Sequence, residues 1–170
     1  MHVAQPPPRT VAAVEFAIGA YTGVKVRPGK GLPHAEAVAG ILRADGADES
    51  TQVAALLHDV VEDTSLSVED VRASFGDRVA AIVAALSEDE SIKRYATRKR
   101  ALRSQIASAE PATMDIALAD KIASLRDAAI TGATISARKL SHYRATLRLA
   151  QASGGSTRLV AQLERLLDPV

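Results

Sequence analysis

The sequence predicts an all-α bundle of about eight or nine helices. Alanine accounts for 33 of the 170 residues, and asparagine is absent. Small, helix-favouring side chains at this density favour helices that pack closely, and the alternation typical of strands is scarce. The few glycines and prolines fall where helices should end. We therefore expect almost no strand, and one core that a chain of this length can bury.

Helix signals can be followed in order along the first half of the chain. The first two helices flank one long loop, Thr22–Pro33. The third begins with a competent N-cap and carries a run of valine, alanine and leucine. Ser67 and Asp70 resemble a capping box for the fourth, and Asp77 can cap the fifth. The expected ranges are Val11–Tyr21, His34–Ala44, Asp48 or Ser50 through Val61, Ser67–Phe75 and Asp77–Leu86.

Four further helices are expected in the second half. The first of them is strongly basic, and Pro111 stands at a typical first-turn position for the next. The expected ranges are Ser91–Ala109, Pro111–Ala129, Thr134–Ala152 and Thr157–Leu167. No repeat or linker divides the chain, so we expect a flexible tail at residues 1–9, with its three successive prolines, and a single domain at residues 10–170.

Composition excludes several classes of function. Without cysteine there can be no disulfide, thiolate metal site or thiol nucleophile. A net charge of +1 and only five Phe and Tyr residues argue against nucleic acid as a partner. No apolar run approaches the ~18–20 residues of a membrane span, and the N-terminus has no hydrophobic signal core. A cytoplasmic location is expected, and the oligomeric state is not indicated.

Ionisable residues concentrate at His58–Asp63, where they interrupt an otherwise apolar helix. Helical spacing pairs His58 with Glu62 and Asp59 with Asp63. The histidine and its neighbouring aspartate can both reach one cation, and the two later carboxylates can hold a water beside it. Imidazole and carboxylate ligands suit Mn²⁺, Fe²⁺, Zn²⁺ or Mg²⁺. The alternative from spacing alone is a helix end whose acidic residues are merely solvated.

Further ligands must come from elsewhere in the chain. His34 begins an apolar helix directly after the long loop, whereas His2 lies in the tail. The favoured carboxylate is Asp120, an acidic interruption beside an apolar helix face. Its alternative role is an intrahelical pair with Lys121 or Ser124.

The order His34, His58-Asp59, Asp120 resembles the H…HD…D signature of the HD superfamily of metal-dependent phosphohydrolases. Residues 54–64 and 118–126 closely resemble the RelA/SpoT hydrolase domain, and the likeness extends from about Glu15 to about Tyr143. The chain is most similar to stand-alone small alarmone hydrolases. The resemblance implies an HD-domain helical bundle.

The resemblance also implies a reaction and roles for residues. It places a divalent cation, usually Mn²⁺, on His34, His58, Asp59 and Asp120. Glu62 and Asp63 match the acidic pair that positions and activates the attacking water. The implied reaction is hydrolysis of the 3′-diphosphate of guanosine tetra- or pentaphosphate (ppGpp or pppGpp) to GDP or GTP and pyrophosphate.

Departures from the family pattern lie around the nucleotide. The usual basic pair after the first helix is matched only by Lys25 and Arg27, and Ser124 replaces an asparagine near the ribose. Lys139 and Tyr143 match a pair that contacts substrate. These changes leave open ppApp, NADPH or another nucleoside phosphate as the substrate, or a non-catalytic nucleotide-binding module. A basic run either gathers a phosphate group or is a solvated surface; it comprises Lys93, Arg94, Arg98, Lys99, Arg100 and Arg103.

Overall fold

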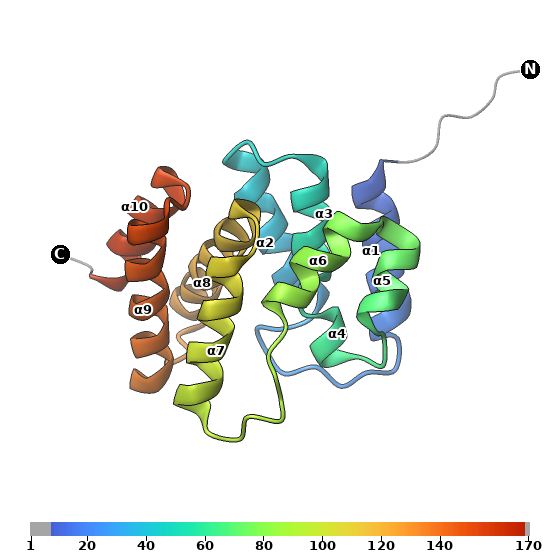
Figure 1. Cartoon of the computed structure of the whole chain (residues 1–170). Coiled ribbons are helices and arrows are strands. Elements are labelled where there is room, and N and C mark those ends of the chain that lie inside the picture. Colours follow the sequence, from blue (N-terminus) through green and yellow to red (C-terminus); the bar gives the residue numbers. More distant parts are fainter. Residues whose placement is uncertain (1–7, 169–170) are drawn as a thin grey trace, which may run out of the picture.

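A computed structural model describes residues 8–168, which form ten α-helices and no strand (Figure 1). The all-α prediction is confirmed. The helices are α1 (Arg9–Tyr21), α2 (Leu32–Ala44), α3 (Glu49–Leu57), α4 (Val60–Asp63), α5 (Val68–Phe75), α6 (Asp77–Leu86), α7 (Tyr95–Ser108), α8 (Pro111–Thr131), α9 (Ala137–Ser153) and α10 (Thr157–Leu167). Residues 1–7 of the expected tail lie outside the described residues, whereas Arg9 is already part of α1.

Local capping signals explain most helix starts. Asp48 caps α3 by accepting a hydrogen bond from the Thr51 N–H at 2.8 Å. The capping box of Ser67 and Asp70 is present at α5. The prediction that Asp77 caps α6 is wrong, because Gly76 takes the cap position. Asp77 is instead the first helical residue, and its carboxylate pairs with Arg72 at 2.6 Å.

The basic helix α7 starts later than the sequence suggested. Asp89 closes a turn here: its carboxylate accepts the Ser91 N–H at 2.9 Å, and its carbonyl accepts the Ile92 N–H at 3.1 Å. Arg94 then has an extended backbone (φ −76°, ψ 115°), and α7 begins at Tyr95. Similarly, α9 starts at Ala137 because the Ser136 side chain caps it.

The expected third helix is not continuous, and this break accounts for the tenth element. Helix α3 ends at Leu57, and α4 begins at Val60. Between them, Asp59 has φ −98° and ψ −5°, in the sparsely populated bridge region where residues of functional sites often lie. The break falls on the His-Asp pair itself. Helical hydrogen bonding resumes after the break, where the Asp63 N–H donates to the Asp59 carbonyl at 2.9 Å.

Helix α8 lies at the centre of the bundle, between α2 and the C-terminal pair α9–α10, and it also contacts α7 (Figure 1). Nine of its residues are buried, among them Ala117, Ala119 and Ala123. Small side chains there allow neighbouring helices to approach closely, so α8 can be buried on most sides. Asp120 lies within this buried stretch. Within residues 8–168, no helix has both the length and the apolar character that crossing a membrane requires.

Candidate metal centre and adjoining cavity

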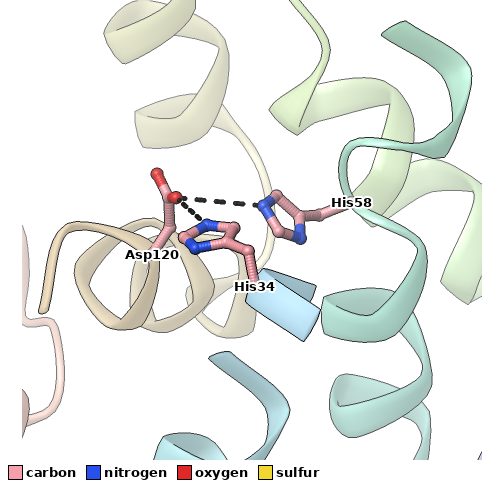
Figure 2. Close-up of side chains that lie close together, drawn as sticks. All are labelled: His34, His58 and Asp120. Atoms are coloured by element: carbon pink, nitrogen blue, oxygen red, sulfur yellow. Dashed lines mark hydrogen bonds and ion pairs between the residues drawn. The ribbon is translucent and has the colours of Figure 1, made fainter. Parts of the chain in front are cut away.

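Three predicted ligands, from three separate helices or helix ends, converge on one point (Figure 2). His34 comes from the first turn of α2, His58 follows α3, and Asp120 belongs to α8. One donor atom from each residue lies within 4.8 Å of the others. The Asp120 Oδ1 atom is 2.8 Å from Nε2 of His34 and 3.9 Å from Nε2 of His58. The structure thus brings together residues that are far apart in the sequence.

The hydrogen bonding of His58 leaves one nitrogen bare. Its Nδ1 lies 2.7 Å from the Ala55 carbonyl, so Nδ1 carries the proton and donates it. Its Nε2 is then an acceptor, and it is buried without a hydrogen-bond partner among the described residues. A buried acceptor left unpaired costs free energy. A histidine held by a backbone carbonyl through one nitrogen is the usual arrangement of a metal ligand that binds through the other. The donor set therefore fits a divalent cation.

Asp120 offers separate oxygens to two kinds of partner. Oδ1 faces the histidines, while Oδ2 accepts a hydrogen bond from the buried Lys121 ammonium at 2.8 Å. The pairing with Lys121, considered above as an alternative to metal binding, is thus present together with the cluster. Burial would raise the pKa of Asp120. The Lys121 charge and the His34 hydrogen bond outweigh it and hold this pKa well below the usual value.

Asp59, the fourth predicted ligand, lies beside the cluster but outside the three-donor group. Its Oδ1 is 3.4 Å from Nε2 of His58, and its Oδ2 accepts a hydrogen bond from the Lys30 ammonium at 2.7 Å. Burial alone would raise its pKa, but the charge of Lys30 and the hydrogen bond from its ammonium help to outweigh burial, and the pKa is lowered. The carboxylate is ionised and close to the site, and a lysine occupies one of its oxygens.

Glu62 and Asp63 occupy distinct environments at the edge of the cluster. Glu62 Oε1 accepts a hydrogen bond from the Glu88 N–H, and burial is the main cause that raises its pKa to about 7. Asp63 Oδ2 accepts a hydrogen bond from the Tyr21 hydroxyl at 3.4 Å. Both carboxylates line a cavity that adjoins the ligands. Glu62 is therefore poised to exchange a proton near neutral pH.

This cavity has a volume of about 400 Å³, within the range of small-molecule sites. Four of the five predicted substrate-binding residues line it: Arg27, Ser124, Lys139 and Tyr143. Lys25 is exposed and does not line it. Cationic side chains outnumber carboxylates on the walls of this cavity. The cationic residues are Arg27, Lys30, Arg98, Lys99, Lys121, Arg138 and Lys139. Such walls suit a polyanion.

Lys30 is a site residue that the sequence reasoning missed. Its ammonium reaches the cluster from the loop between α1 and α2, which passes near α4 in Figure 1. It stands between Gly29 and Gly31, whose φ angles are 71° and 76°. Glycine adopts such angles without the strain that a Cβ would bring. A lysine enclosed by two glycines was the available signal. Tyr21 was likewise missed as a partner of Asp63.

Residues 13–149 match the HD domain family. The chain belongs to this family. Guanosine-3′,5′-bis(diphosphate) 3′-pyrophosphohydrolase MESH1 of Drosophila melanogaster is 44% identical over 80 residues, which cover 47% of this chain and 44% of that protein. Its Homo sapiens counterpart is 31% identical over 120 residues, covering 68% of this chain and 66% of that protein. The chain thus spans less than two thirds of the length of these relatives.

Solved structures carry the similarity across nearly the whole HD domain. A metazoan ortholog of SpoT, which hydrolyses ppGpp, superposes with a TM-score of 0.79 at 28% identity, over 96% of each chain. A protein of Listeria monocytogenes EGD-e superposes with a TM-score of 0.69 at 28% identity, over 79% of this chain and 95% of that one. The arrangement of helices is therefore shared with the HD fold, as expected from the sequence.

Proposed function

We propose that this HD domain, residues 10–170, is a cytoplasmic hydrolase of the 3′-diphosphate of ppGpp and pppGpp. The observation that carries the proposal is the bare, buried Nε2 of His58, which faces His34 and Asp120 at the end of a cation-lined cavity. A metal centre beside such walls suits phosphate hydrolysis. Similarity to named 3′-pyrophosphohydrolases supports the choice of substrate.

We propose His34, His58, Asp59 and Asp120 as the residues that hold the cation, and Mn²⁺ as the cation. Nitrogen and oxygen donors without thiolate suit Mn²⁺ among the divalent metals. When bound, such an ion supplies a Lewis acid that polarises phosphoryl oxygens and lowers the pKa of a coordinated water. Asp59 can join the set through Oδ1, which lies 3.4 Å from Nε2 of His58, while Oδ2 keeps its ion pair with Lys30.

The proposed reaction needs a base for the attacking water. Its oxygen bonds to the phosphorus next to the ribose, and the bond from that phosphorus to the 3′-oxygen breaks. Glu62 Oε1 is engaged by the Glu88 N–H, so Oε2 is the atom that takes the proton from water. Asp63, oriented by Tyr21, helps to hold the water. The leaving 3′-oxygen then receives a proton, which yields GDP or GTP and pyrophosphate.

The remaining walls of the cavity would bind the nucleotide. Arg27 and Lys139 offer charge to phosphates, the buried Tyr143 ring offers an apolar surface, and Ser124 offers a short hydroxyl near the ribose. These residues support nucleotide binding but do not distinguish guanine from adenine. Lys25, being outside the cavity, is replaced in this proposal by Arg27 and Lys30.

The decisive experiment incubates the purified protein with Mn²⁺ and ppGpp, pppGpp, ppApp or NADPH, and identifies products by chromatography. We expect pyrophosphate with GDP from ppGpp and with GTP from pppGpp, and loss of turnover on chelation. Faster hydrolysis of ppApp or NADPH would assign another nucleotide to the same centre. No turnover of any of the four, with metal bound, would refute the proposal.

A further inference from the structure

A second, smaller groove of about 190 Å³ continues from the cavity between α7 and α9. Its walls include Tyr95, Lys99 and Arg103 of α7 and Arg138 and His142 of α9. We refer to these five residues as the cationic groove. All of them except Arg103 also line the cavity, so the two spaces are joined.

The cationic groove carries three cations, and no carboxylate lines it. Within residues 8–168, neither Arg103 nor Arg138 forms an ion pair. An Nη atom of Arg103 donates to Nδ1 of His142 at 2.8 Å, and the Arg138 guanidinium lies 4.2 Å from the centre of the Tyr95 ring. Each guanidinium has five N–H donors, so most of them stay available. These free N–H donors can bind an anion in the groove.

The residues around Arg103 add to the positive charge of the cationic groove or leave it unchanged. His142 accepts the Arg103 hydrogen bond, and burial, followed by the charges of Lys121 and Lys99, lowers its pKa to about 2. The ring therefore stays neutral and orients Arg103. Burial and the nearby Arg148 and Arg100 lower the pKa of Arg103 itself. Lys99 is paired with Glu88, but the charges of Arg103 and Arg138 have no carboxylate partner among the described residues, and a bound phosphate would supply one.

The hydroxyl group of Tyr95 also indicates a missing polar partner. Its hydroxyl is buried and has no hydrogen-bond partner among the described residues. Its ring carries Arg138 on one face and lies within 6 Å of Arg98 and Lys99 as well, at 5.8 Å and 5.6 Å. An O–H donor without a partner and a guanidinium held by stacking both suit the oxygens of a phosphate group.

We propose that the cationic groove binds the 5′-phosphate groups of a nucleotide whose 3′-diphosphate lies at the metal centre. This inference rests on the proposed function and extends it. The carboxylates Glu62, Asp63, Glu88 and Asp120 line the larger cavity, whereas no carboxylate lines the joined groove. The enzyme would thus select nucleotides that carry phosphate groups at both ends.

Basic residues on α7 have different surroundings. Arg98 and Lys99 line the cavity, and both pair with Glu88, the former at 2.6 Å. Arg103 faces the groove, whereas Arg100 is exposed and lines neither space. Arg100 lies on the same helix and has the same charge. It therefore provides a matched control.

The test compares two substrates that differ only at the 5′ end: ppGpp, and guanosine 3′-diphosphate with a free 5′-hydroxyl. Arg103→Gln keeps a donor for His142 and removes the charge. We expect KM for ppGpp to rise tenfold to roughly a hundredfold, the usual range for one hydrogen bond to a charged group, with kcat unchanged. KM for the 5′-hydroxyl substrate should stay within about twofold of wild type. Arg138→Gln should behave alike, and Arg100→Gln should leave both KM values unchanged.

An equal rise in KM for both substrates, or no rise for ppGpp, would overturn the groove assignment while leaving the proposed function intact.

If the wild-type protein hydrolyses neither substrate, the proposed function fails instead, and calorimetric titration with GDP tests the groove separately. GDP carries phosphate only at its 5′ end. Binding of GDP weakened about tenfold in Arg103→Gln and unchanged in Arg100→Gln supports the groove. Equal binding to all three proteins overturns it. Thermal unfolding verifies that each variant is folded.

Discussion

Replacing Glu62 by glutamine should change how the stability of the ion-free protein depends on pH. Burial raises the pKa of this carboxyl from its ordinary 4.5 to about 7 in the folded chain. The folded state therefore binds the proton more tightly than the unfolded state does. The stabilising contribution is complete below pH 4.5 and is lost as the pH rises through about 7. Glutamine stays neutral throughout, and its oxygen can still accept the Glu88 N–H.

The magnitude follows from the two pKa values. Each tenfold change in proton affinity is worth about 1.4 kcal/mol, so the shift from 4.5 to about 7 corresponds to at most about 3 kcal/mol. Glu62→Gln should thus gain up to about 3 kcal/mol of unfolding free energy over wild type between pH 4.5 and pH 8. All other titrating groups are common to both proteins and largely cancel in the difference.

Urea unfolding of chelator-treated protein at pH 5 and pH 8 measures this difference. A chelator is needed because a bound cation would add its own stabilisation and lower the pKa of Glu62. Glu36→Gln, which removes an exposed carboxylate, is the control and should show the same difference from wild type at both pH values. If the difference between Glu62→Gln and wild type is also independent of pH, the argument from burial is wrong.

Further substitutions test the ligands, the base and the nucleotide contact separately. His58→Ala removes the bare nitrogen and should abolish calorimetric binding of Mn²⁺; undiminished binding would refute the ligand assignment. Lys30→Met removes a positive charge beside Asp59 and should tighten Mn²⁺ binding by about tenfold, so weaker binding would contradict charge repulsion between Lys30 and the cation. Glu62→Gln or Asp63→Asn should lower kcat by ~10²–10⁴-fold with the metal retained, and near wild-type rates in both would exclude the proton-transfer role. Ser124→Asn should lower KM for ppGpp by roughly 2- to 13-fold with kcat nearly unchanged, whereas a collapse of kcat would place the nucleotide elsewhere.

Features decided by local chemistry could be read from the sequence. The capping box of Ser67 and Asp70, the start of α8 at Pro111 and the cap of α3 by Asp48 depend on side chains within a few residues of the helix end. The break between Leu57 and Val60 does not depend on such local side chains. It accompanies the burial of His58 and the ion pair of Asp59 with a lysine that lies 29 residues away. Helical periodicity alone gives no sign of such a tertiary contact.

The predicted ligand set rests on the resemblance of His34, His58-Asp59 and Asp120 to the H…HD…D signature, because helical spacing alone left solvated carboxylates as an alternative. The convergence of His34, His58 and Asp120 depends on how α2, α3 and α8 pack, and the structure supplies it. Lys30 could not be predicted, since a lysine in a long loop has no periodic pattern that would show where its side chain points. The resemblance points instead to Lys25 and Arg27, which match the basic pair of the family.

The two ligand carboxylates share one arrangement. Asp120 keeps Lys121 on Oδ2 and directs Oδ1 at the histidines, so it can serve as a ligand without losing its ion pair. Asp59 likewise keeps Lys30 on Oδ2, while its Oδ1 lies 3.4 Å from Nε2 of His58. Breaking an ion pair with partly buried partners would cost free energy, and neither carboxylate has to break one to offer Oδ1 to a cation. Lys30 and Lys121 therefore hold the two carboxylates in place and leave one oxygen of each for the cation.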